Sequence, residues 1–116
     1  MQVLLHTDNH LTADEALTQR VEDEVHAALE RFEGQITRVE VHVNDANGHK
    51  SGERDKRCLM EARLSGHQPV AASDEADNFG EAIRGAAEKL EHALAKLFDK
   101  LSHHKGRTSF GGDQTI

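Results

Sequence analysis

Histidine is unusually frequent in this chain, and its imidazole nitrogens can bind transition metals. The 116 residues contain nine histidines and one cysteine, Cys58. The histidines are scattered over the sequence at His6, His10, His26, His42, His49, His67, His92, His103 and His104. No two of them form the helical i, i+4 metal pair joined to further ligands. We therefore expect surface histidines, no metal and no cofactor.

Other catalytic patterns are missing from the sequence. There is no glycine-rich phosphate loop, no nucleophile elbow and no cysteine–histidine dyad. Paired carboxylates are present, but acid–base catalysis would need a concave pocket that so small a domain rarely offers. We expect a protein that is not an enzyme and has no small-molecule substrate.

Basic residues near the end of the chain have a spacing that suits contact with nucleic acid. Lys89, Lys96 and Lys100 follow one another at intervals of seven and four residues, which places them on one side of a helix. The full set of candidate RNA-binding residues is Arg84, Lys89, Lys96, Lys100 and Lys105, with Arg57 and Arg63 as secondary members. The alternative is a solvated helix face whose lysines pair with nearby glutamates for a few tenths of a kcal/mol. The residues alone favour this alternative.

The net charge of −7 is unusual for a protein that binds nucleic acid. Residues 1–35 contain eight acidic and two basic residues, whereas residues 76–116 contain six of each. Any surface that faces phosphates must therefore come from the middle and the C-terminal part of the chain. The acidic first third is either a solvated face or a surface for a basic protein, and the sequence does not decide between them.

Two amphipathic helices and four strands are expected to position these residues. Strands are predicted at residues 1–7, 38–44, 57–64 and 69–73, and helices at residues 13–33 and from 79 to about 105. Thr12 and Glu15 have the form of a capping box for the first helix, and Gly34 is expected to end it in a left-handed conformation. Residues 44–55 are predicted to form a long hairpin loop.

This order, β-α-β-β-β-α, predicts an α+β fold with a four-stranded sheet and both helices on one face. One domain is expected over residues 1–105, followed by a flexible tail over residues 106–116. The other face of the sheet would be open to water or to a partner. Its expected side chains are Arg38, Glu40, His42, Arg57, Glu61 and Arg63.

Several short strings resemble one known family. The string Asp77-Asn78-Phe79-Gly80-Glu81-Ala82-Ile83 is followed by Glu88-Lys89-Leu90 and by Leu97-Phe98-Asp99-Lys100-Leu101. Met1-Gln2-Val3, Leu11-Thr12 and Glu15-Ala16-Leu17 stand near the start. In this order the strings are similar to those of the hibernation-promoting factor and ribosome-associated inhibitor family, also called sigma modulation proteins. About ten residues follow the second helix, so the resemblance is to the short form.

The resemblance implies a translation silencer that binds the small ribosomal subunit, at the rRNA of the decoding region, during stress or slow growth. Ribosomal proteins are a further candidate partner. It favours the RNA-binding interpretation of the lysines, although Glu24 and Ala27 stand where the family commonly has lysine. The remaining alternative is an acidic protein-interaction module of the same fold with weak or no RNA binding.

The single cysteine is typical of a reducing compartment, and the chain has neither a secretory signal pattern nor an apolar stretch that could span a membrane. We therefore expect a cytoplasmic protein without a membrane partner.

Overall fold

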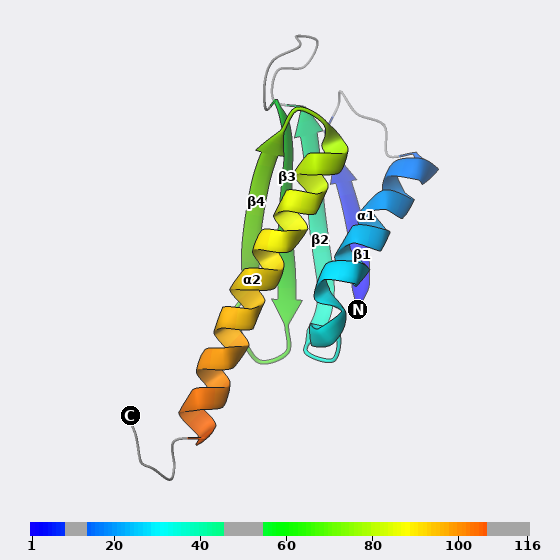
Figure 1. The fold of residues 1–116 in the computed structure, drawn as a ribbon. Coiled ribbons are helices and arrows are strands. Elements are labelled where there is room, and N and C mark those ends of the chain that lie inside the picture. Colours follow the sequence, from blue (N-terminus) through cyan, green and yellow to red (C-terminus); the bar gives the residue numbers. More distant parts are fainter. Residues whose placement is uncertain (9–13, 46–54, 107–116) are drawn as a thin grey trace.

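The computed structural model describes residues 1–8, 14–45 and 55–106, with only the backbone given for residues 103–106. Figure 1 shows a sheet of four strands beneath two helices. In chain order the elements are β1 (Gln2–Thr7), α1 (Glu15–Leu29), the short 3₁₀ helix η1 (Glu30–Phe32), β2 (Ile36–Asp45), β3 (Lys56–Leu64), β4 (Val70–Ala76) and α2 (Phe79–Gly106). The predicted α+β order is confirmed.

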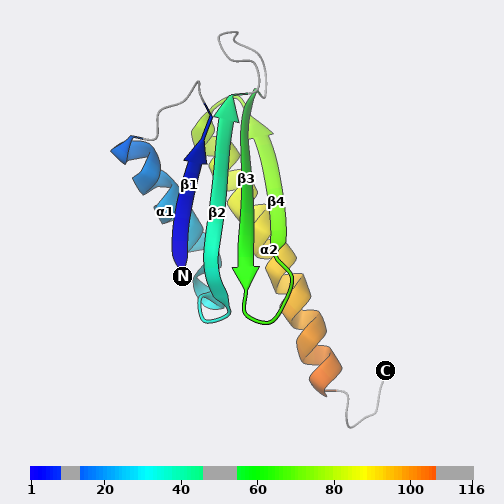
Figure 2. The ribbon, with the colours of Figure 1, turned by 180° about the vertical axis from the view of Figure 1, so that it is seen from behind.

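The four strands lie side by side in the order of the chain, β1-β2-β3-β4. β1 runs parallel to β2, because α1 separates them in the sequence, and the two later pairs are antiparallel. Viewed from behind, the sheet lies in front of both helices (Figure 2). The prediction of two helices on one face of the sheet is therefore also confirmed.

Alternation along the central strands separates the core from the open face. Val39, Val41 and Val43 of β2 and Cys58, Met60 and Ala62 of β3 are buried, while the residues between them point away from the helices. Phe32, Ile83, Leu90 and Leu94 complete the core from the helical layer. Burial, followed by the charge of Asp74, raises the pKa of the Cys58 thiol to about 12, so this thiol stays protonated.

The helix α2 is longer than the sheet that it covers. Its 28 residues span about 42 Å at 1.5 Å per residue, whereas the nine residues of β3 span about 30 Å. Asn78 caps the start of α2, where its side chain accepts a hydrogen bond of 2.9 Å from the Glu81 amide. The C-terminal turns project beyond the sheet (Figures 1 and 2). No helix among the described residues is long and apolar enough to span a bilayer.

The predicted helix over residues 13–33 is present as α1 and η1, but both of its predicted caps are wrong. Asp14 caps the helix by accepting a hydrogen bond of 2.8 Å from the Leu17 amide, while Thr12 lies outside the described residues. A carboxylate is as good a cap as a hydroxyl and also complements the helix dipole. At the other end the α-helix stops at Leu29 and tightens into η1, and Gly34 does not have a positive φ. The tighter turn places Phe32 in the core.

The strand β4 extends further than predicted. It begins at Val70 and continues to Ala76 instead of stopping at Ser73. Asp74 and Glu75 have poor strand propensity, yet they pair with Cys58 and Arg57 of β3. Ion pairs made by both carboxylates support this extension. The first two residues of the loop predicted at 44–55 belong to β2, which ends at Asp45. Residues 46–54 lie outside the described part of the chain.

Truncation of the central core side chain on α2 tests the packing of the two layers. Leu90 is fully buried, so Leu90→Ala should lower the free energy of unfolding by about 2–5 kcal/mol. Leu59→Ala is the matched control because Leu59 is 39% exposed on the open face, and it should cost far less. Urea unfolding followed by circular dichroism measures both. Equal losses would contradict the assignment of the buried face.

Candidate nucleic-acid interface

Three lysines line one side of α2, and we call them the lysine flank: Lys89, Lys96 and Lys100. All three side chains are exposed. At about 100° per residue they fall within roughly 40° of one another around the helix axis. Arg84 lies about 140° away from Lys89, on the side of α2 that faces α1. The structure thus places Lys89, Lys96 and Lys100 side by side and separates Arg84 from them.

Lys89 is held by a carboxylate of the edge strand. Its Nζ lies 3.0 Å from Oδ1 of Asp74, which points from β4 toward α2. The Asp74 carboxylate fits there because the facing helix residue is Gly85: a Cβ at Gly85 would lie 1.7 Å from Oδ2 of Asp74. Lys89 therefore links α2 to β4 by an ion pair. Its predicted contact with RNA would require this ion pair to open.

Lys96 and Lys100 differ from Lys89 in their surroundings. Within the described part of the chain, neither they nor Arg84 form an ion pair. Lys100 lies near the end of α2 that projects beyond the sheet. Lys105 belongs to the same helix, but its side chain lies outside the described residues. Of the lysine flank, Lys96 and Lys100 can thus approach a phosphate without first leaving a described carboxylate, and the same holds for Arg84 on the other side of α2.

The two arginines predicted on the open face are paired. Arg57 contacts Glu75 at 2.7 Å across β3 and β4. Arg63 lies 3.1 Å from Glu61 and 3.7 Å from Glu40. Since exposed ion pairs contribute about 0–1 kcal/mol, these arginines can exchange partners. They remain candidates for binding phosphate, but at present they neutralise neighbouring glutamates.

Glu40 is the centre of the charges on the open face. Arg38 lies 2.9 Å from its carboxylate, and His6 approaches from β1 at 3.4 Å. Partial burial tends to raise the pKa of Glu40, but the hydrogen bond from Arg38 and the charges of Arg38, Arg63 and His6 outweigh it and hold the pKa below its ordinary value. Glu40 is therefore ionised at neutral pH, and this face carries balanced charges.

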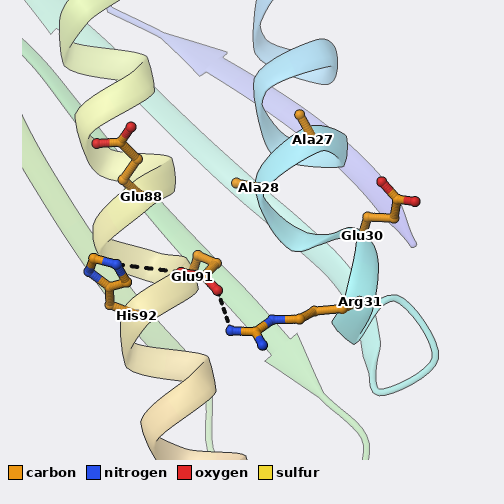
Figure 3. Close-up of a pocket in the computed structure, with 7 residues that line it drawn as sticks. All are labelled: Ala27, Ala28, Glu30, Arg31, Glu88, Glu91 and His92. Atoms are coloured by element: carbon orange, nitrogen blue, oxygen red, sulfur yellow. Dashed lines mark hydrogen bonds and ion pairs between the residues drawn. The ribbon is translucent and has the colours of Figure 1, made fainter.

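A groove of about 920 Å³ separates the end of α1 from α2. Figure 3 shows the side chains that line it: Ala27, Ala28, Glu30, Arg31, Glu88, Glu91 and His92. Ala27 and Ala28 line it from α1, and Arg31 reaches across one end to form an ion pair with Glu91. Three glutamates against one arginine make the groove acidic. The sequence did not indicate this groove, because its width depends on the separation of the two helices.

Comparison with known families decides what kind of protein carries these surfaces. Residues 5–102 match the family model described as "Sigma 54 modulation protein / S30EA ribosomal protein". The chain belongs to this family. The resemblance seen in the sequence is therefore confirmed, and the family is one of ribosome-associated modulation proteins. Among curated proteins, none matches the sequence.

Two solved structures share the fold. A ribosomal subunit interface protein from Coxiella burnetii superposes with a TM-score of 0.69 at 18% identity, covering 85% of this chain and 99% of its own. The N-terminal domain of Protein Y from Thermus thermophilus superposes with a TM-score of 0.67 at 21% identity, covering 84% of this chain and 99% of its own. At these identities the likeness establishes the shared fold.

Substitution of Gly85 tests how closely α2 approaches β4 in this family member. Gly→Ala inside a helix ordinarily stabilises by about 1 kcal/mol, but here the new methyl group would displace the Asp74 carboxylate from Lys89. We expect Gly85→Ala to lower the free energy of unfolding by about 1–3 kcal/mol. In an Asp74→Ala background the same change should be neutral or stabilising, as urea titrations can measure.

Gly80→Ala is the matched control for this cycle. The nearest atoms to a Cβ at Gly80 belong to the flexible end of Arg20, so they can move aside. If Gly85→Ala and Gly80→Ala cost the same in both backgrounds, the close approach at Asp74 does not constrain the helix.

Proposed function

We propose that this protein silences translation without enzymatic chemistry by binding the small ribosomal subunit at the rRNA of the decoding region. Binding would occur in the cytoplasm during stress or slow growth. Membership of the family supports the association with ribosomes. The observation that carries the RNA contact is the pair of exposed lysines, Lys96 and Lys100, which form no ion pair among the described residues.

The distribution of charge supports this orientation. Helix α1 exposes acidic residues, including Glu15 and Asp23, and these would repel phosphates. The lysine flank lies on the side of α2 away from α1, because Glu91, which pairs with Arg31, lies about 160° around the helix axis from Lys89. An RNA backbone would therefore approach the outer edge of α2, along β4, and stay away from α1. A few lysine–phosphate contacts would give an affinity that falls steeply with salt.

A second candidate function is supported by the acidic groove. A basic peptide segment, such as one from a ribosomal protein, could place an arginine or lysine in the groove that Glu30, Glu88 and Glu91 line. This interpretation uses the fold as a protein-interaction module with weak or no RNA binding. It requires the glutamates of the groove, whereas the first candidate requires Lys96 and Lys100.

The proposed RNA contact is tested by replacing Lys96 and Lys100. Lys96→Gln with Lys100→Gln should weaken co-sedimentation with small subunits and lower the slope of log affinity against log salt by about 0.7–0.9 for each lysine. Because neither lysine forms an ion pair with a described residue, the melting temperature should change little. Binding across a salt series and thermal unfolding measure the two effects.

Arg20→Gln with Arg31→Gln is the matched control, since it removes the same charge from the α1 side of the molecule. This variant should keep the salt slope of the unmodified protein. Glu30→Gln with Glu88→Gln distinguishes the two candidate functions. If the protein binds RNA, this variant should bind slightly more strongly, whereas a protein that binds a basic peptide in the groove should lose its partner. Normal binding by the lysine variant together with loss in the glutamate variant would replace the first candidate by the second.

A further inference from the structure

Two histidines and a glutamate meet on the open face of the sheet. His6 of β1 and His42 of β2 are direct partners in the parallel register, and Glu40 precedes His42 by two residues on the same face. The imidazole rings lie with their centroids 4.6 Å apart, and Nε2 of His6 is 3.4 Å from Oε1 of Glu40. One donor atom from each of the three side chains lies within 4.8 Å of the others.

From this arrangement we propose that His6, His42 and Glu40 form a binding site for one divalent transition metal ion of the zinc type. Two neutral imidazoles and one carboxylate are a donor set that zinc accepts, with a fourth position left for water. No metal was expected from the sequence, because the histidines are scattered along the chain. The parallel pairing of β1 with β2 brings two of them together.

The geometry needs only a small adjustment to bind the ion. Tetrahedral zinc with Zn–N distances of about 2.0–2.1 Å places its ligand atoms roughly 3.3 Å from one another. The rings are nearly parallel, at 16°, so one imidazole must turn before both lone pairs point to a common centre. His42 is exposed and the side chain of His6 is 47% exposed, so this rotation displaces no core side chain.

The neighbouring charges prepare Glu40 to act as a ligand. Arg38 holds Oε2 of Glu40 at 2.9 Å and leaves Oε1 directed toward His6. A ligand that is oriented by a second group loses less freedom when the metal binds. The positive charges of Arg38 and Arg63 oppose a cation, so the affinity should be moderate. A small hollow of about 260 Å³ adjoins both histidines and includes Asp8 and Leu59, which gives the ion access to water.

The bound ion would also change the charge of this face. A bound dication would give the balanced open face a net positive charge. This role is independent of the lysine flank and of ribosome binding.

The test is calorimetric titration of the full, untagged chain with zinc chloride at neutral pH, with NMR of the imidazole nitrogens as a second readout. We expect one zinc ion per chain and shifted resonances for His6 and His42. His6→Ala and His42→Ala should each weaken binding at least tenfold. His92→Ala is the matched control, because His92 is 83% exposed on α2 and distant from the cluster, and it should bind as the unmodified protein does.

Circular dichroism of each variant verifies the fold, and exposed histidines should be replaceable without loss of structure. The proposal is overturned if zinc produces no saturable heat, or if its binding is unchanged in both His6→Ala and His42→Ala. It is equally overturned if His92→Ala removes the binding.

Discussion

The packing of α2 over β3 and β4 is the contact on which the rest of the structure depends. Leu90, Leu94 and Ile83 are fully buried beneath this helix, and Gly85 allows its backbone to approach the edge strand. Because the apolar stripe of α2 must face the sheet, its lysines fall on the outer flank and its glutamates on the side toward α1. The same contact leaves the other face of the sheet uncovered (Figure 2). The orientation of α2 therefore determines where the lysine flank, the groove and the open face lie.

Charge is arranged differently on each of these surfaces. On the open face arginines and glutamates neutralise one another across neighbouring strands, with Glu40 at the centre. Along α2 the lysines become less constrained toward the C-terminal end, from Lys89, which is paired with Asp74, to Lys100. A chain with a net charge of −7 can thus still present cations to phosphate, because its acid is concentrated on α1 and around the groove. The surface proposed to contact RNA is small, and its affinity should depend strongly on salt.

The sequence predicted the fold and the elements, because apolar periodicity depends on neighbours along the chain. The alternation of Val39, Val41 and Val43 identified a strand with one buried face, which the structure confirms. Features that depend on contacts between elements were missed. The extension of β4 through Asp74 depends on α2 above it, and the meeting of His6 with His42 depends on the register of β1 with β2. The lysine flank was predicted from helical spacing, but the pairing of Lys89 was not, since Asp74 lies fifteen residues earlier.

The central claim, that the outer flank of α2 faces ribosomal RNA, is tested most directly by photo-crosslinking from single positions. Cys58 is buried and its thiol has a pKa of about 12, so a cysteine introduced on the surface can be labelled selectively. A photoreactive label would be placed at position 92 beside the lysine flank, at position 73 on the open face, and at position 23 on α1, through His92→Cys, Ser73→Cys and Asp23→Cys. On small subunits the label at position 92 should crosslink to rRNA much more efficiently than the other two. Crosslinks to rRNA mainly from position 23 or 73, or to protein alone from position 92, would contradict the account.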